Sequence, residues 1–264
     1  MTPPNATPSP PIPLAGKRVM VTGGSSGIGR AIAIGAARAG ADVMITFRRN
    51  QAGANDVAAL IHEAGRRAAL VQADIGEPDD LARLVETARA TFGGIDGWVN
   101  NAGADVLTGV GAALSRREKL DLLLRVDLRG TMLASWAAAE LLRAGTGGGG
   151  GVIINMSWDG AVRGMEGENP ELFAAVKGGV LSFSRSLARS LAPSIRVNVL
   201  GPGWIETAFG DGAPTAFKQE IARSIPLRRW GTPEDVASAA IYLLSDAARY
   251  VTGQMILVNG GDVM

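Results

Sequence analysis

Short apolar runs alternate along the chain with longer stretches in which apolar residues recur at helical spacing. Short runs of this kind predict buried strands, and apolar positions three and four residues apart predict amphipathic helices. The predicted strands cover residues 19–21, 42–47, 68–72, 95–99, 152–155, 195–200 and 254–258. One predicted helix begins near residue 28, and the others cover residues 51–65, about 78–91, 115–143, 171–192 and about 233–245.

Strands that alternate with helices at this spacing predict an α/β fold, in which a parallel sheet is covered by helices on both faces. The 264 residues of the chain suit a single doubly wound domain, which we place at residues 15–264. In such sheets, ligands bind beyond the carboxyl ends of the strands. We therefore expect the informative residues just after each predicted strand.

Two segments depart from the alternation. Residues 1–13 hold six prolines, and we interpret residues 1–14 as a disordered, partly extended tail. The tail lacks the basic and apolar regions of a signal peptide. Residues 147–151 are all glycine, and we interpret them as a mobile surface linker.

Charge and composition narrow the possible function classes. The net charge is +1 and there is no long basic run, which argues against a nucleic-acid surface. The chain has no cysteine, and its one histidine, His62, is expected on the surface, so thiolate and multi-histidine metal sites are excluded. No apolar run approaches the roughly 20 residues of a membrane span. We expect a cytoplasmic protein whose partner is a small molecule, not nucleic acid or membrane.

The strongest local signal is the glycine-rich turn after the first predicted strand. Val19, Met20 and Val21 lead into glycines at positions 23, 27 and 29, and an alanine-rich helix follows. Glycines let backbone N–H groups approach an anion at the positive end of a helix. A strand before the turn and a helix after it favour a nucleotide site over a chance glycine turn.

Further motifs follow the other predicted strands in a specific order. The full set is Thr22-Gly23-Gly24-Ser25-Ser26-Gly27-Ile28-Gly29, Ala73-Asp74-Ile75, Asn100-Asn101-Ala102-Gly103, Lys177, Asn198, Pro202-Gly203 and Gly260-Gly261. By these motifs the chain resembles the short-chain dehydrogenase/reductase family over residues 15–264. The resemblance implies a seven-stranded Rossmann-type sheet and a nicotinamide cofactor. It also implies a homo-oligomer, tetramer or dimer, in which helices 115–143 and 171–192 pair with their copies.

The resemblance also implies which residues hold the cofactor. The turn would bind the pyrophosphate through Gly23, Ser25, Ser26, Gly27, Ile28 and Gly29. Asp74 and Ile75 would meet the adenine, and Asn101, Ala102 and Gly103 would support the adenosine ribose. Lys177 would hold the nicotinamide ribose, and Pro202, Gly203, Ile205 and Thr207 would cover the nicotinamide. Asn100 and Asn198 fit a core role as well as a site role.

Residues 47–50 bear on which dinucleotide binds. A unit that binds NAD places an acidic residue about twenty positions past the glycines. Here that place holds Arg48 and Arg49 and no carboxylate. A guanidinium can pair bidentately with a 2′-phosphate, although two solvated arginines at a helix entry are the alternative. We predict NADP(H) in preference to NAD(H).

The reaction centre departs from the family pattern of a serine, an upstream asparagine and a Tyr-x-x-x-Lys helix. Ser157 and Lys177 match the serine and lysine, but Phe173 stands in the tyrosine position and has no proton to give. Ser157 lies three residues farther from this position than is usual, and Asp127 replaces the asparagine. Asp127 brings a negative charge toward Lys177.

Other proton donors can be considered. The only tyrosines, Tyr242 and Tyr250, lie in a late helix and in the loop before the last strand, away from the expected centre. The lengthened loop brings the acids Asp159, Glu166, Glu168 and Glu171. A carboxylic acid with a raised pKa in a closed, apolar site can donate a proton, although solvated loop carboxylates are the simpler interpretation.

Two functions therefore remain open. The first is an NADP(H)-dependent oxidoreductase for a carbonyl or alcohol substrate, with Ser157 orienting the oxygen and a proton from water or a loop acid. The second is a non-catalytic dinucleotide-binding or regulatory subunit. We expect substrate specificity in a lid at about residues 204–226, where Trp204, Phe209 and Phe217 indicate either an apolar lid or aromatic core packing.

Overall fold

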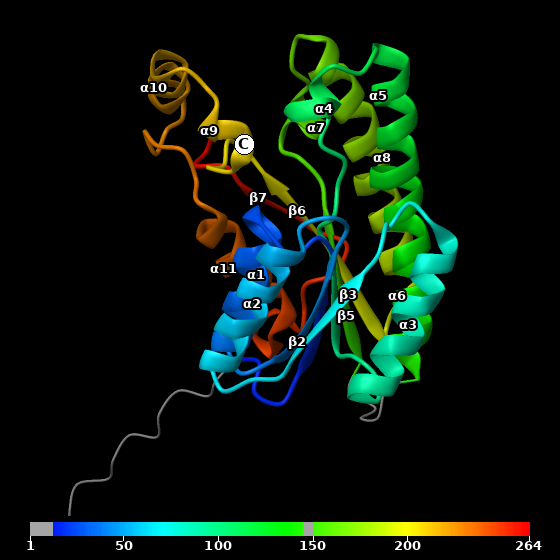
Figure 1. The fold of residues 1–264 in the computed structure, drawn as a ribbon. Helices are drawn as coiled ribbons and strands as arrows, with labels where there is room; N and C mark the ends of the chain where they lie inside the picture. The colour runs from blue at the N-terminus through cyan, green and yellow to red at the C-terminus, as the bar shows by residue number, and fades with distance from the viewer. Residues whose placement is uncertain (1–12, 145–149) are drawn as a thin grey trace, which may run out of the picture.

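The computed structural model describes residues 13–144 and 150–264, and within them the strands form one parallel sheet (Figure 1). The order across the sheet is β3-β2-β1-β4-β5-β6-β7, and every neighbouring pair is parallel. The strands are β1 (Arg18–Val21), β2 (Asp42–Phe47), β3 (Ala68–Gln72), β4 (Gly97–Asn100), β5 (Gly151–Met156), β6 (Ile195–Pro202) and β7 (Met255–Val258). The predicted doubly wound α/β fold is confirmed.

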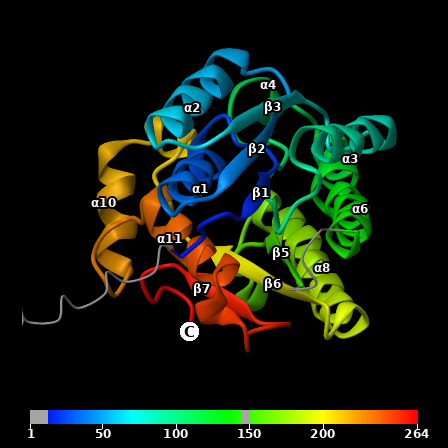
Figure 2. The same ribbon diagram turned by 90° about the horizontal axis from the view of Figure 1, so that it is seen from below.

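Helices cover both faces of the sheet, as Figure 2 shows from below. On one face lie α1 (Gly27–Arg38), α2 (Gln51–Glu63) and α11 (Pro233–Leu244), and on the other lie α3 (Pro78–Phe92), α6 (Thr131–Arg143) and α8 (Glu168–Leu191). Alternate strand residues divide between two apolar cores. Val19 and Val21 pack in the core of α1 and α11, and Met20 packs in the core of α3, α6 and α8.

The predicted single helix over residues 115–143 is wrong in one respect. The chain forms α5 (Arg116–Leu123), a π-helical segment η1 (Leu124–Gly130) and then α6. Ser115 and Glu118 form a capping box at the start of α5, which agrees with the predicted helix start at residue 115. The π-helix coincides with side-chain contacts from Asp127 to other segments, and a π-bulge is a frequent feature of functional sites.

Two further glycines lie within strands, and one of them corrects the predicted linker. Gly97 lies inside β4, where a Cβ would come within 2.6 Å of Leu244 Cδ2, so its lack of a side chain lets α11 pack against the sheet. Gly151 is the first residue of β5 and is buried beneath Leu142, so it does not belong to a linker. Residues 147–149 of the predicted linker lie outside the described residues.

Short helices that the sequence did not predict follow the carboxyl ends of the strands, in the upper part of Figure 1. They are α4 (Gly109–Ala112), α7 (Gly160–Arg163), α9 (Ala208–Asp211) and α10 (Thr215–Ser224). A 3-10 turn, η2 (Asp246–Ala248), follows α11. The short helices α4, α7, α9 and α10 surround the edge of the sheet where ligands are expected.

The start of the described chain already packs into the domain. Leu14 is fully buried, and its backbone N–H donates to Ala39 O at 2.8 Å. The predicted tail over residues 1–12 lies outside the described residues. His62 is exposed as expected, with Nδ1 3.1 Å from Arg66 O. None of the helices in the described chain is both long and apolar enough to cross a membrane.

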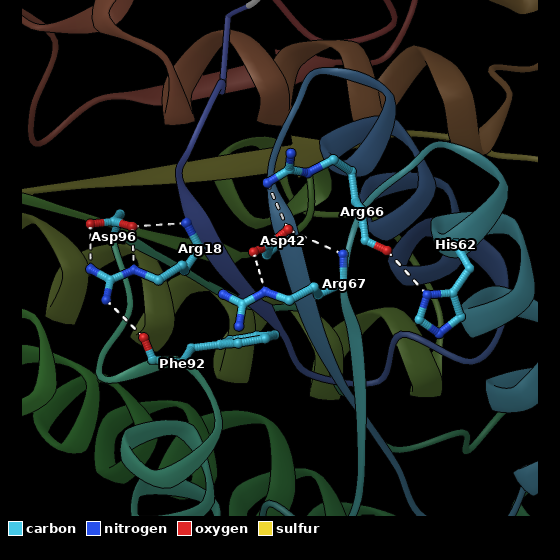
Figure 3. Close-up of polar contacts among 7 residues, drawn as sticks. All are labelled: Arg18, Asp42, His62, Arg66, Arg67, Phe92 and Asp96. Carbon is cyan, nitrogen blue, oxygen red and sulfur yellow. Dashed lines mark hydrogen bonds and ion pairs between the residues drawn. The ribbon is translucent and has the colours of Figure 1, made fainter.

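The amino ends of the strands are tied together by ion pairs (Figure 3). Arg18, at the start of β1, binds Asp96 before β4 through Nε–Oδ2 and Nη2–Oδ1 distances of 2.9 and 3.0 Å. Asp42, at the start of β2, contacts Arg66 Nη2 and Arg67 Nε, each at 2.7 Å. These contacts fix the edge of the sheet opposite the expected site.

Candidate functional site

The glycine turn after β1 and the segment after β4 meet at the point where the order of the strands reverses. Asn101 and Ala102 both donate backbone N–H groups to Thr22 Oγ1 at 3.0 Å. Asn101 Nδ2 also donates to Thr22 O at 3.0 Å and to Gly23 O at 3.2 Å. This is the position at which doubly wound sheets bind nucleotides.

Glycine is required in this turn for steric reasons. Gly23 has a φ of +65°, and a Cβ there would lie 2.9 Å from Ala102 Cα. A Cβ on Gly29 would lie 2.3 Å from Gly23 O. Ser26 begins α1 without a side-chain capping bond, so the first amides of the helix are available to an anion. The turn therefore fits the pyrophosphate of a dinucleotide.

The ends of β2 and β3 bring the predicted adenosine residues together. Asp74 accepts a hydrogen bond from Gly76 N at 2.9 Å, and its Oδ2 lies 3.7 Å from Arg48 Nη1. Ile75 is buried beside it, whereas Arg49 is exposed. Arg125 of η1 also reaches Asp74 Oδ2, at 3.6 Å. The sequence did not single out Arg125, because only the fold brings η1 to the end of β3.

The predicted catalytic residues converge from three elements. Lys177 Nζ, on α8, lies 2.9 Å from Asp127 Oδ1 and donates to Met156 O at 3.4 Å. The Asp127 side chain is 2% exposed, and its Oδ2 accepts from Ala104 N at 2.8 Å. Ser157 Oγ, just past β5, donates to Lys177 O at 2.9 Å. The charge of Asp127 is therefore in direct contact with the lysine.

Phe173 lies one helical turn before Lys177, on the same helix. Its ring packs edge-on against Trp158, with centroids 6.4 Å apart, and against an apolar cluster that includes Leu123 and Leu172. The ring offers this centre no proton. A further donor or a different function must be considered.

The two tyrosines do not supply that donor. Tyr250 is fully exposed and precedes β7, which places it toward the amino edge of the sheet. Tyr242 is 42% exposed on α11. Both lie where the sequence placed them, away from Ser157.

The four acids of the lengthened loop differ in their surroundings. Glu166, Glu168 and Glu171 are exposed, and Glu171 forms an ion pair with Arg116. Asp159 is 3% exposed. Burial raises the pKa of the Asp159 carboxyl, and the nearby Asp262 charge adds to the effect. Hydrogen bonds from Asn259 and the Gly160 amide and the charge of Arg163 oppose it only in part.

The two asparagines whose role was open both have structural partners. Asn100 Nδ2 donates to Asn155 Oδ1 at 2.8 Å, and Asn155 Nδ2 donates to Ser184 Oγ at 2.9 Å. This buried network joins β4, β5 and α8 beneath the site. Asn198 donates to Val251 O at 2.9 Å and accepts from Gln254 N at 3.1 Å, which holds the loop before β7.

The segment after β6 connects the site to the predicted lid. Ile205 is buried, and a Cβ on Gly27 would lie 3.7 Å from Thr207 Cγ2, so this segment reaches the glycine turn. The Trp204 ring lies 5.8 Å from that of Phe217 on α10 and 5.3 Å from that of Trp230. These aromatic contacts pack α10 against the segment that follows β6. The Phe209 side chain lies outside the described residues.

Comparisons with known proteins agree with this geometry. A family model described as enoyl-(acyl carrier protein) reductase matches residues 23–262. An L-rhamnose 1-dehydrogenase (NAD(P)(+)) of Sphingomonas sp. strain SKA58 is 38% identical over 94% of this chain and 96% of the relative. A short-chain type dehydrogenase/reductase of Picea abies is 36% identical over 95% of this chain and 93% of the relative.

Solved structures extend the likeness to the fold. The crystal structure of a short chain dehydrogenase from Burkholderia cenocepacia J2315 in complex with NADP has a TM-score of 0.84 and 34% identity to this chain. The match covers 94% of this chain and 98% of that one. Together with the matched family model and the glycine turn at the end of β1, these similarities show that the chain belongs to the short-chain dehydrogenase/reductase family.

Proposed function

We propose that the protein is an NADP(H)-dependent oxidoreductase that interconverts an alcohol and a carbonyl group, with a proton donor other than tyrosine. The proposal rests on the convergence of Ser157, Lys177 and Asp127 at the sheet edge that carries the glycine turn. The dinucleotide would supply or accept a hydride. Ser157 would orient the substrate oxygen, and Lys177 would hold the nicotinamide ribose.

The preference for NADP(H) rests on the charges around Asp74. The exposed Arg48 guanidinium lies at the end of β2, and residues 47–50 contain no carboxylate that would repel a 2′-phosphate. The Burkholderia structure contains NADP, and the Sphingomonas relative is named for NAD(P)(+), which supports this assignment. The names of the relatives also support an alcohol or carbonyl substrate.

A fluorescence titration tests the cofactor. We expect NADPH to bind more tightly than NADH, and Arg48→Ala to lower the affinity for NADPH by about tenfold, or ~1.4 kcal/mol. Its affinity for NADH should change little, because NADH lacks the 2′-phosphate. Arg38→Ala, at the far end of α1, is the matched control. Tighter binding of NADH by the wild type would contradict the proposal.

A non-catalytic dinucleotide-binding subunit is the second candidate, and Phe173 is the observation that favours it. A panel of ketones, quinones and imines with NADPH separates the two candidates. Turnover supports the oxidoreductase, whereas tight binding of NADPH without turnover supports the binding subunit. If Phe173→Tyr gains activity, the missing phenol is the limiting defect.

We further propose that the chain forms a homo-oligomer through α6 and η1. Trp136 and Leu124 are 48% and 41% exposed, and they border an apolar hollow of about 460 Å³. An exposed apolar face of this kind is typical of an interface. Size-exclusion chromatography with light scattering should show a dimer or tetramer. Trp136→Glu should dissociate it, whereas Val110→Glu, on α4, should not.

A further inference from the structure

Asp159 lies two residues after Ser157, just past the end of β5. The chain continues to pair with β6 beyond the end of β5, since Ser157 N donates to Leu200 O at 2.8 Å and Asp159 N donates to Pro202 O at 3.1 Å. Asp159 then turns the chain into α7, with φ −62° and ψ −36°. Ser157 and Asp159 therefore both follow β5 at the carboxyl edge of the sheet, next to the end of β6.

The carboxyl group rests on the segment that follows β6. A Cβ on Gly203 would lie 2.8 Å from Asp159 Oδ2, so the carboxyl occupies space that only glycine leaves free. The same oxygen accepts a hydrogen bond from Asn259 Nδ2 at 3.2 Å. The Asp159 carboxyl thus contacts the segment that is expected to cover the nicotinamide.

The charges around Asp159 favour its neutral form. The charge of Arg163 on α7 acts on it, but the Arg163 guanidinium pairs with Asp262 in the C-terminal segment, with Nη2–Oδ2 at 3.8 Å. Within residues 13–144 and 150–264, no basic group forms an ion pair with Asp159. A buried carboxyl without a cationic partner avoids the cost of desolvating its charge by keeping its proton.

The other acids near this edge are less suited to donate a proton. Asp127 is ion-paired with Lys177. Asp105 is exposed and accepts hydrogen bonds from the amides of Leu107 and Thr108. The remaining acids of the lengthened loop are exposed to solvent. Asp159 alone among these acids is both buried and free of a cationic partner.

We propose that Asp159 takes the place of the missing tyrosine as the proton donor of the site. The proposal rests on the proposed oxidoreductase function. As a hydride adds to the carbonyl carbon, the π electron pair moves to the substrate oxygen. The O–H bond of Asp159 breaks, its proton forms the O–H bond of the alcohol, and the electron pair remains on the carboxylate. Water then returns a proton to Asp159, and alcohol oxidation runs the same steps in reverse.

A titration without cofactor or substrate tests the required protonation state. In ¹³C NMR of protein labelled at the aspartate carboxyl carbon, Asp159→Asn identifies the resonance by its disappearance. We expect that resonance to titrate above the ordinary aspartate pKa of about 3.9. Asn259→Ala should raise the pKa further, because the amide stabilises the carboxylate, and it gives a second assignment if Asp159→Asn folds poorly. Titration at or below the ordinary pKa would overturn the proposal.

Turnover tests the catalytic role itself. Asp159→Asn should lower kcat for carbonyl reduction by about 10²–10⁴-fold, the usual contribution of a general acid, while the Kd for NADPH stays unchanged. The wild-type rate should fall as pH rises through the pKa of Asp159, and Asn259→Ala should move this decline to higher pH. Glu166→Gln, an exposed acid of the same loop, should behave as wild type.

The outcomes separate the two proposals. A wild type that turns over substrate, with Asp159→Asn equally active, overturns the role of Asp159 and leaves the oxidoreductase function in place. A wild type that binds NADPH but turns over no substrate overturns both. If Asn259→Ala does not move the alkaline decline, a structural role for Asp159 explains the loss better than proton donation.

Discussion

The amino and carboxyl edges of the sheet differ in whether their charged groups have partners within the protein. At the amino edge, Arg18 and Asp96 form a bidentate ion pair, and Asp42 contacts two arginines at 2.7 Å (Figure 3). At the carboxyl edge, the first amides of α1 lack a side-chain cap and the buried Asp159 has no cationic partner in the described chain. Groups whose partners lie within the chain hold the fold together, whereas groups left without such partners are available to a ligand.

The pKa values of the aspartates also differ between the two edges. Burial alone would raise the pKa of Asp96, but hydrogen bonds and charge from Arg18 outweigh it and lower the pKa. For Asp42, burial is likewise outweighed by hydrogen bonds from Arg67 and by the charges of Arg66 and Arg67. For Asp159, burial prevails and the pKa is raised. The contributions of these carboxyl groups to the free energy of unfolding should therefore change with pH in opposite directions at the two edges.

The largest expected effect breaks the buried ion pair between Lys177 and Asp127 at the carboxyl edge. Lys177→Met leaves the Asp127 carboxylate buried and unpaired, which should lower the free energy of unfolding by about 3–5 kcal/mol in urea denaturation. Adding Asp127→Asn should recover most of this loss. Lys119→Met is the control, because among the described residues the buried Lys119 donates to the neutral Asn169, at 3.2 Å, and forms no ion pair. Equal losses in Lys177→Met and Lys119→Met would contradict this account.

The next effect tests the glycine turn. Gly29→Ala forces a Cβ to within 2.3 Å of Gly23 O, so we expect NADPH affinity to fall by about 10–100-fold, equivalent to an overpacking cost of ~1–3 kcal/mol. Gly35→Ala, on the same helix, meets nothing closer than 3.5 Å. It should bind NADPH normally and gain about 0.5–1 kcal/mol of stability. Equal affinities of the two variants in a fluorescence titration would refute the steric argument.

A smaller effect is expected in how stability depends on pH at the two edges. Asp96→Asn should lose about 1–2 kcal/mol of stability at pH 7, the range for a partly exposed, charge-assisted pair. Because the folded pKa of Asp96 is lowered, its contribution exists above the unfolded pKa of about 3.9 and disappears as pH falls through the folded pKa. Thermal unfolding of Asp96→Asn should therefore depend less on pH on the acid side than that of the wild type.

Asp159→Asn should change the pH dependence of stability in the opposite direction. A raised folded pKa contributes stability below the unfolded pKa, and that contribution is lost as pH rises through the folded pKa. The variant should therefore reduce the loss of stability above about pH 4. A change on the acid side like that of Asp96→Asn would show that Asp159 is charged in the folded protein.

The smallest effect is expected away from both edges. Arg89 and Glu86 form an exposed pair on α3 at 3.1 Å, three residues apart, with side chains 46% and 72% exposed. Solvent screens such pairs, so Arg89→Ala should change the free energy of unfolding by less than about 0.5 kcal/mol. A loss of stability as large as that of Asp96→Asn would mean that an ion pair at the sheet edge stabilises the protein no more than an exposed pair on a helix.

Local pattern predicted the fold well because strands and helices follow from the spacing of apolar residues. The bounds of β2 and β3 agree with those predicted from the sequence. The interruption at η1 was missed because the spacing of apolar residues continues through residues 115–143, while the contacts of Asp127 come from distant segments. The packing role of Gly97 could not be predicted, because Leu244, which lies against it, is far along the chain.

The sequence by itself determined the alternating fold, the glycine turn and the order of motifs, since each depends on neighbouring residues. It also gave the phenylalanine at position 173, because residue identity needs no structure. Only the tertiary structure decided that Asp127 touches Lys177, that Arg125 reaches Asp74, and that Asp159 differs from the other loop acids. Burial and charge pairing arise from segments that meet only in the folded chain, and those two quantities determine which of several similar acids can hold a proton.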